Sequence, residues 1–127
     1  IINCDNGGIS TFSSAPPIIK NNIIAFNDHY GIHREGILGS VAQPILSYND
    51  VYGNAVAYQE IADPGVGTIE VNPLFFNGFY LTLSSPCIDA GDPDPSYNDP
   101  DGSRNDMGAV PYDGSVSTDP GWFQSVR

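Results

Sequence analysis

The stretch PIIKNNIIAFN, residues 17–27, is repeated 27 residues later as PILSYNDVYGN, residues 44–54. The two copies place like side chains at equivalent positions: Asn22 and Asn49, Ile24 and Val51, Asn27 and Asn54. A weaker copy, IINCDNGGI at residues 1–9, matches residues 24–32. A repeat of this length is typical of a solenoid, in which each copy forms one turn and successive turns stack on one another.

The repeated unit is predicted to form strands rather than helices. It is rich in Ile, Val, Tyr and Asn, is interrupted by Gly and Pro, and contains no run with a helical period. Asn suits the corners between strands, where stacked Asn side chains either form an amide ladder or simply make turns. We expect seven side chains to point inward on stacked parallel strands: Ile18, Ile24, Ile45, Val51, Ile69, Leu81 and Ile88.

Two motifs further along the chain point to the same architecture. Residues 85–93 read SPCIDAGDP, and residues 99–109 read DPDGSRNDMGA. Together they resemble the C-terminal segment of right-handed parallel β-helix proteins of microbial cell surfaces, of the choice-of-anchor type. The resemblance implies an all-β fold, a right-handed parallel β-helix (solenoid) of about four to five rungs. Residues 1–112 would form the rungs and an acidic C-terminal closing loop, and residues 113–127 a tail.

The later rungs are less regular than the repeated ones. The stretches 67–71 and 80–83 are the strands expected there, and Cys87 follows within the first motif. Cys87 and Cys4 are the two cysteines of the chain. A disulfide would suit an extracellular protein, but sequence does not establish that the two residues are close, and we favour two buried thiols.

The negative charge of the chain excludes some classes of binding partner. Its formal net charge is −11, and its only Lys and Arg residues are Lys20, Arg34, Arg104 and Arg127. Phosphate groups would be repelled by this charge, so nucleic acid is not expected as a partner. No stretch is long enough to cross a membrane as a helix, so membrane insertion is not expected either. The resemblance implies an extracellular or cell-surface location.

Acidic residues gather in the predicted closing loop. Oxygen-bearing side chains at alternate positions, followed by Gly, are a feature of calcium-binding loops. Asp99, Asp101 and Asp106 are therefore candidate calcium ligands, and calcium is the one cofactor that the sequence suggests. The alternative is a turn rich in Asp, Pro and Gly that covers the last rung with solvated charge, and in that case no cofactor is required.

Arg104 is the only basic residue of this acidic region. A guanidinium group among carboxylates favours a bidentate ion pair. We expect Arg104 to pair with Asp89, Asp101 or Asp106, with Asp89 as the structural partner, and so to hold the closing loop in place.

No catalytic residues are assigned. The paired Asp, Gly-His-Gly and Arg-x-Lys motifs of polygalacturonase-like enzymes are absent from the sequence. The one group that joins acids with a base is residues 28–35, where Arg34 would have to abstract the proton in a lyase reaction. We interpret this group as a polar corner between rungs. The sequence thus predicts a non-catalytic structural or adhesive module.

Two other function classes remain as alternatives. One is a polysaccharide-degrading lyase or hydrolase, and the other is a calcium-stabilised module that binds glycans. Rings that point outward stack on sugar faces, so a polysaccharide partner would use aromatic side chains. The candidates are Tyr30, Tyr48, Tyr52, Tyr58, Tyr80 and Phe79.

The first residues predict assembly. They read as a strand without a polar cap, and an uncovered solenoid end exposes main-chain donors and acceptors as well as the apolar interior. We expect upstream rungs of a longer chain, or a second copy stacked head to tail, to cover this end. Ile1 and Ile2 at the end, and Trp122 and Phe123 in the tail, are the candidate assembly residues.

Overall fold

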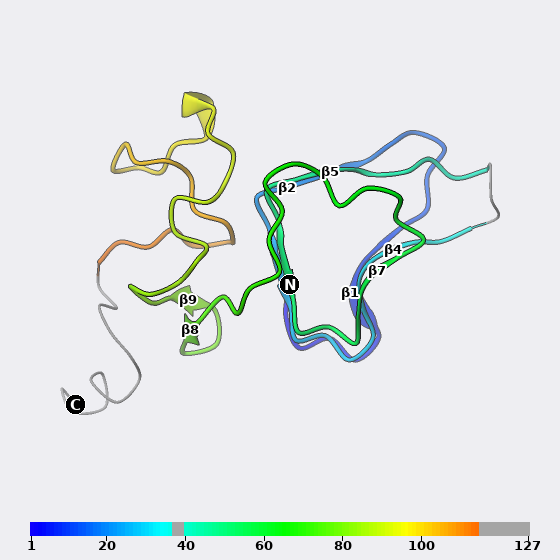
Figure 1. The fold of residues 1–127 in the computed structure, drawn as a ribbon, viewed down its shortest axis with the longest axis horizontal. Helices are drawn as coiled ribbons and strands as arrows, with labels where there is room; N and C mark the ends of the chain where they lie inside the picture. The colour runs from blue at the N-terminus through cyan, green and yellow to red at the C-terminus, as the bar shows by residue number, and fades with distance from the viewer. Residues whose placement is uncertain (37–39, 115–127) are drawn as a thin grey trace.

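The computed structural model describes residues 1–36 and 40–114. Regular structure in this part of the chain is almost all strand, and its one helical element is the short 3₁₀ turn η1 (Pro95–Tyr97). The prediction of an all-β fold is therefore confirmed. None of the described helices is long and apolar enough to cross a membrane. Figure 1 shows two regions, here called the stacked turns (residues 1–71) and the C-terminal block (residues 72–114).

The stacked turns contain a three-stranded parallel sheet in the order β1-β4-β7. Its strands are β1 (Gly7–Thr11), β4 (Tyr30–Arg34) and β7 (Val56–Gln59). Ile9 pairs with Ile32, and Ile32 pairs with Tyr58. Because each partner lies one repeat further along the chain, successive passes of the backbone run over one another (Figure 1).

Two shorter parallel pairs complete each pass. They join β2 (Ile18–Lys20) to β5 (Ile45–Ser47), and β3 (Ile23–Ala25) to β6 (Asp50–Tyr52). Partners in both pairs are 27 residues apart, as the aligned sequence copies predict: Ile18 pairs with Ile45, and Ile24 with Val51. Single parallel bridges extend the pairing at both ends: Ile2 pairs with Ala25 at one end, and Ser47 with Val66 and Asp50 with Ile69 at the other.

Asparagine side chains join the turns at two corners. The Asn49 Oδ1 accepts from the Asn22 main-chain N–H at 3.0 Å and from the Asn22 Nδ2 at 3.3 Å. At the second corner the Asn54 Oδ1 accepts from the Asn27 main-chain N–H at 3.1 Å and from its Nδ2 at 2.8 Å. The Asn27 Oδ1 in turn accepts from the N–H of Cys4, so this ladder spans three turns.

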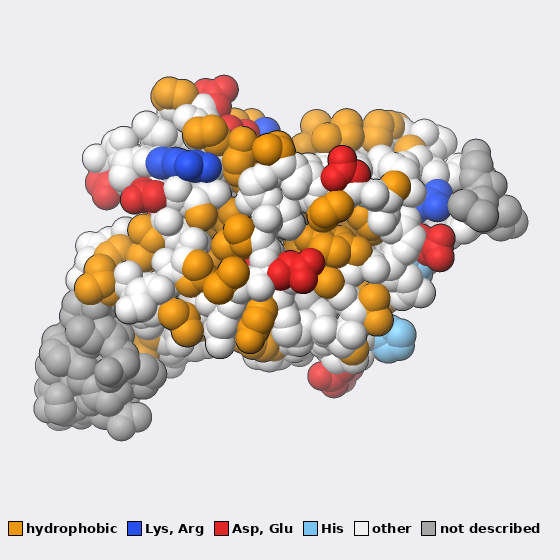
Figure 2. All heavy atoms as spheres, viewed as in Figure 1, with side chains coloured by type: hydrophobic (Ala, Val, Ile, Leu, Met, Phe, Trp, Pro, Cys, Tyr) orange, Lys and Arg blue, Asp and Glu red, His pale blue; other side chains and the backbone are white. Residues whose placement is uncertain are grey.

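The interior of the turns is an apolar core, but the predicted strand phase is partly wrong. Ile24 and Val51 are buried as predicted, whereas Ile18 is 70% exposed and Ile45 is 54% exposed. Figure 2 shows hydrophobic side chains along the edge where β2 and β5 run. The core positions of these two strands are instead Ile19 and Leu46. Because side chains alternate along a strand, an error of one residue moves the whole set to the other face.

The C-terminal block does not continue the parallel pairing. Its strands β8 (Phe75–Phe76) and β9 (Tyr80–Leu81) form an antiparallel pair. Leu81 is buried, but it belongs to this hairpin and not to a further parallel strand at residues 80–83. Ile69 and Ile88 are only partly buried. The predicted role of the closing loop also needs correction, because the block lies beside the stacked turns and not over the last of them (Figure 1).

A second apolar core explains where the block lies. Ile23 and Ala25 of β3 project away from the interior core, and they pack with Leu81, Cys87 and Met107 of the block. All three residues of β3 are buried, because one face of the strand looks into the turns and the other looks onto the block. The two cores thus share strand β3.

Candidate functional site

The predicted calcium ligands are engaged by the protein's own donors. Asp106 is buried, and its two carboxylate oxygens accept from the N–H groups of Asp89 at 2.7 Å and Tyr112 at 2.6 Å. Burial raises the pKa of the Asp106 carboxyl. Asp99 accepts from the Asp106 N–H, and Asp101 accepts from both the N–H and the hydroxyl of Ser103.

The Asp99 carboxylate lies beside Asp106, whose pKa it helps burial to raise, whereas Asp101 bonds its own neighbour Ser103. Within residues 1–36 and 40–114, no group of three or more His, Cys, Asp or Glu side chains has the arrangement to hold a metal ion. Calcium binding by Asp99, Asp101 and Asp106 stays a prediction. In the structure their side chains accept hydrogen bonds from other residues of the C-terminal block.

Arg104 has partners other than those predicted. Its Nε donates to the main-chain oxygen of Gly91 at 2.8 Å, and its guanidinium carbon lies 5.9 Å from the centre of the Tyr48 ring. The ion pairs found among the described residues do not include Arg104 with Asp89, and the Asp89 side chain is exposed. The expected pair is therefore replaced by contacts with a carbonyl and an aromatic ring.

Lys20 supplies the ion pair that fastens the loop. Its Nζ lies 2.8 Å from the Asp92 Oδ2, and it also lies 4.8 Å from the centre of the Tyr97 ring. The hydrogen bond from Lys20 lowers the pKa of Asp92, and the same bond raises the pKa of Lys20. The N–H of Asp92 adds a bond to the Asn21 side chain at 2.8 Å. This region of the loop is thus tied to the corner after β2.

The His-containing group at residues 28–35 forms a structural corner. The His33 Nδ1 lies 3.8 Å from the Glu35 Oε1. Arg34 is buried, and its guanidinium donates to the main-chain oxygens of Glu60 and Val41, each at 3.0 Å. An Arg side chain held in this way joins β4 to neighbouring segments.

The aromatic candidates divide between core and surface. Tyr48 and Tyr52 pack against the second core, and Tyr58 packs against the interior core. The Tyr58 hydroxyl is buried without a hydrogen-bond partner, and burial raises its pKa. Phe79 and Tyr80 are 49% and 39% exposed, with ring centres 4.6 Å apart. Only part of the predicted set is therefore available to a ligand.

A buried carboxyl and thiol meet between the two regions. Asp50 of β6 is fully buried, and its Oδ2 accepts from the Cys87 Sγ at 3.2 Å, while its Oδ1 accepts from the N–H of Val71. Burial raises the pKa of Asp50, and burial together with the nearby Asp50 charge raises that of Cys87. Cys87 and Cys4 are both free thiols, but only Cys87 is buried as we favoured, and Cys4 is partly exposed.

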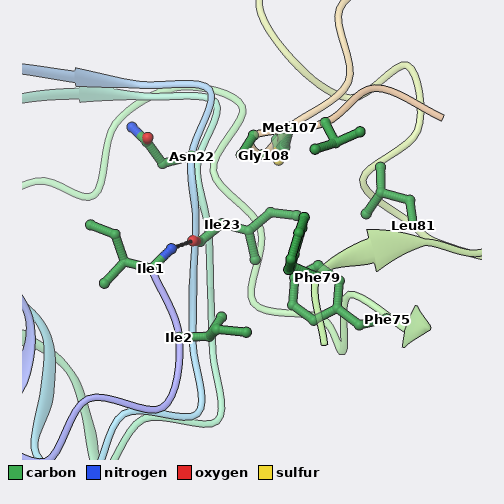
Figure 3. A pocket seen from close by; sticks show the side chains of 11 residues that line it. Ile1, Ile2, Asn22, Ile23, Phe75, Phe79, Leu81, Met107 and Gly108 are labelled. Atoms are coloured by element: carbon green, nitrogen blue, oxygen red, sulfur yellow. Dashed lines mark hydrogen bonds between the residues drawn. The ribbon is translucent and has the colours of Figure 1, made fainter. Parts of the chain in front are cut away.

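An apolar cavity of about 450 Å³ opens at the same junction. One wall comes from the first turns, including Ile1, Ile2 and Ile23, and the other from the C-terminal block, including Phe79 and Leu81 (Figure 3). The N-terminal amino group is held at 2.7 Å from the Ile23 oxygen, which fixes the Ile1 side of the opening. Trp122 and Phe123, the other predicted assembly residues, lie outside the described residues.

Comparisons with known proteins give no relative: a scan of protein-family models, a search of curated proteins and a search of solved structures all find no match. The likeness of residues 85–109 to β-helix surface proteins therefore stays a prediction.

Three features of the junction were missed by sequence reasoning: the Asp50–Cys87 contact, the Lys20–Asp92 ion pair and the cavity. One signal was present. The run Ile23-Ile24-Ala25 is apolar at consecutive positions, a pattern typical of a strand that is buried on both faces. It indicates a second layer against β3, although it does not identify which segment supplies that layer.

Proposed function

We propose that the chain is a non-catalytic structural module of an extracellular or cell-surface protein. Its stacked turns would be a segment of a right-handed parallel β-helix, and its activity would be assembly. The partner is another turn of the same structure, from a second copy stacked head to tail or from a longer form of the chain. The observation that carries this proposal is the open sheet edge at the first turn.

Strand β1 is an edge strand, paired with β4 on one side only. Thr11 directs its carbonyl to that side, where it accepts from the N–H of Glu35 at 2.9 Å. Main-chain groups of adjacent residues point to opposite sides of a strand, so the N–H and C=O of Ser10 face the open edge. Ser10 is exposed, and no strand covers this edge in the described part of the chain.

Unpaired edges of this kind are sites of strand addition. A strand added beside β1 would continue the same parallel register that joins β1, β4 and β7. Because the contact joins two different surfaces, repeated addition of copies gives a filament unless it closes into a ring. The acidic surface suits an extracellular module, and no step of this proposal needs a catalytic group.

Sedimentation velocity over a range of protein concentrations tests the proposal. The wild-type chain and Ser10→Ala, which keeps the edge N–H, should both form larger species as concentration rises. Ser10→Pro removes that N–H without touching the bonds to β4, and it should remain monomeric with an unchanged circular dichroism spectrum. If Ser10→Pro misfolds, Ser10→Lys should block addition by charge. A wild-type chain that stays monomeric throughout, or edge variants that associate like wild type, would refute it.

A further inference from the structure

One carboxyl group lies where the stacked turns face the C-terminal block. Asp50 of β6 pairs with Ile23 in the preceding pass and with Ile69 in the following one. Both of these neighbours pack on the second core, so Asp50 places a carboxyl group in an otherwise apolar column. The Cys87 side chain of the block covers it, and Asp50 and Cys87 are both fully buried.

Asp50 has few hydrogen-bond donors for a buried carboxylate. It accepts from the N–H of Val71 and from the Cys87 thiol, each at 3.2 Å. An ionised carboxyl offers about four acceptor sites, and a thiol is a weak donor. The ion pairs found within residues 1–36 and 40–114 join other side chains. Ionisation of Asp50 therefore leaves a poorly compensated charge at the junction, which is costly without water.

The groups around Asp50 do not offset that charge. Burial raises the pKa of Asp50 most, and the charge of Glu70 in the following pass raises it further, against the two hydrogen bonds. Asp106 of the block acts on Cys87 in the same direction, and Tyr58 of β7 is a further titratable neighbour. None of these groups is basic, so the neutral carboxyl fits the closed junction and the ionised one favours the entry of water.

The stacked turns and the block depend on the Asp50 side chain to different degrees. The Asp50 N–H donates to the Asn22 oxygen at 2.8 Å, and the Ile69 N–H donates to the Asn49 oxygen at 2.9 Å. These main-chain bonds join successive passes without the carboxyl group. Contact with Cys87 of the block, by contrast, is made by the carboxyl group itself. Water that enters at Asp50 thus separates the block from β6 and leaves the pairing of the turns in place.

We propose that Asp50 acts as a pH-dependent latch: its neutral carboxyl holds the C-terminal block closed over β6, and its ionisation opens the junction around Cys87 while the stacked turns stay folded. The junction is closed at acidic pH and opens as the pH rises from 3.8 through the titration of Asp50 in the folded state. The latch lies within one chain, so it goes beyond the proposed edge assembly and does not depend on it.

The reactivity of the Cys87 thiol tests the latch in the full 127-residue chain with Cys4→Ser, which leaves Cys87 as the only thiol. The rate of reaction with 4,4′-dithiodipyridine is divided at each pH by the rate in denaturing urea, which removes the thiol's own ionisation from the comparison. This ratio should rise several-fold as the pH rises. Asp50→Asn keeps the size of the side chain and an acceptor for Val71, and it should keep the ratio low throughout. Asp28→Asn, at an exposed carboxyl, is the matched control and should behave like wild type.

Amide hydrogen exchange, corrected for intrinsic rates, tests the latch without a variant at Asp50. The Met107 N–H, which donates to the Cys87 oxygen at 3.0 Å, should lose protection as the pH rises, whereas the amides of β4 should keep theirs.

Three outcomes would overturn the latch. They are a thiol ratio and a Met107 exchange rate that do not change with pH, an equal rise of the thiol ratio in folded Asp50→Asn, and a loss of protection in β4 together with Met107, which would indicate unfolding of the whole chain. Ser10→Pro should leave the thiol ratio unchanged, so the latch and edge assembly can fail separately.

Discussion

Successive passes of residues 1–71 make the same contacts at the same places, whereas residues 72–114 are held by contacts that each occur once. In the stacked turns, Asn49 bonds to Asn22 as Asn54 bonds to Asn27. In the C-terminal block, Asp106 accepts from the N–H groups of Asp89 and Tyr112, a pair of contacts that does not recur among the described residues. The comparison shows that one chain combines stacked turns held by repeated contacts with a C-terminal block held by contacts that do not repeat.

The two cores lie on opposite faces of β3, and Ile24 belongs to the interior core alone. Ile24→Ala opens a cavity in the interior core and should lower the free energy of unfolding by about 2–5 kcal/mol. This is the largest effect expected. Ile18→Ala, at a residue that is 70% exposed, should change the free energy of unfolding by less than about 0.5 kcal/mol. Urea unfolding measures both, and equal losses from the two variants would contradict the assigned strand phase.

The next largest loss in the free energy of unfolding is expected from the asparagine ladder. Asn49 is fully buried, accepts from Asn22 and donates from its Nδ2 to the Ile19 oxygen at 2.9 Å. Asn49→Ala leaves these groups without a partner and should cost about 2–3 kcal/mol in urea unfolding. Asn98→Ala removes an exposed amide of the C-terminal block and should be close to neutral. A neutral Asn49→Ala would show that the aligned amides do not stabilise the turns.

The junction should respond to pH through Asp50. Burial raises the pKa of this carboxyl from its ordinary 3.8, so the folded protein keeps the proton to a higher pH than the unfolded chain does. Its contribution to stability is greatest at acidic pH and is lost as the pH rises from 3.8 through the raised pKa of the folded state.

Asp50→Asn should therefore flatten the decline in stability across that window, measured by urea unfolding at a series of pH values. Asp28→Asn, at an exposed carboxyl, is the matched control and should leave the curve unchanged. If Asp50→Asn gives the same pH dependence as wild type, the buried carboxyl does not titrate on folding.

Arg104 should give the smallest effect. Its exposed side chain bonds the Gly91 oxygen and lies over the face of Tyr48, and its charge acts on Asp92 more weakly than the Lys20 hydrogen bond does. Arg104→Ala should cost no more than about 1 kcal/mol. Hydrogen exchange should place that loss in the C-terminal block, with the amides of β4 unaffected. A loss of several kcal/mol would contradict these contacts and would support the ion pair between Arg104 and a carboxylate that the sequence predicts.

The sequence predicts the stacked turns well because their contacts repeat. Aligned copies reveal the register directly, since Asn22 meets Asn49 in both the alignment and the structure. The strand phase fails where adjacent residues are both apolar, because Ile18 and Ile19 fit an inward position equally well. The block is harder to predict because its contacts join distant, unrelated residues. Asp92 bonds Asn21, and nothing in either neighbourhood indicates that partner.

The parallel register of the stacked turns underlies both the two-core description and the proposed assembly, and cross-linking tests it most directly. Ile18 and Ile45 are in-register partners with exposed side chains, and partners on adjacent strands lie within disulfide range. With Cys4 and Cys87 replaced by Ser, the double variant Ile18→Cys/Ile45→Cys should form an intramolecular disulfide readily, whereas Ile18→Cys/Ser47→Cys, out of register by two residues, should form it far more slowly. Equal rates for the two pairs, or no disulfide from the in-register pair in the folded protein, would contradict the stacking of these turns.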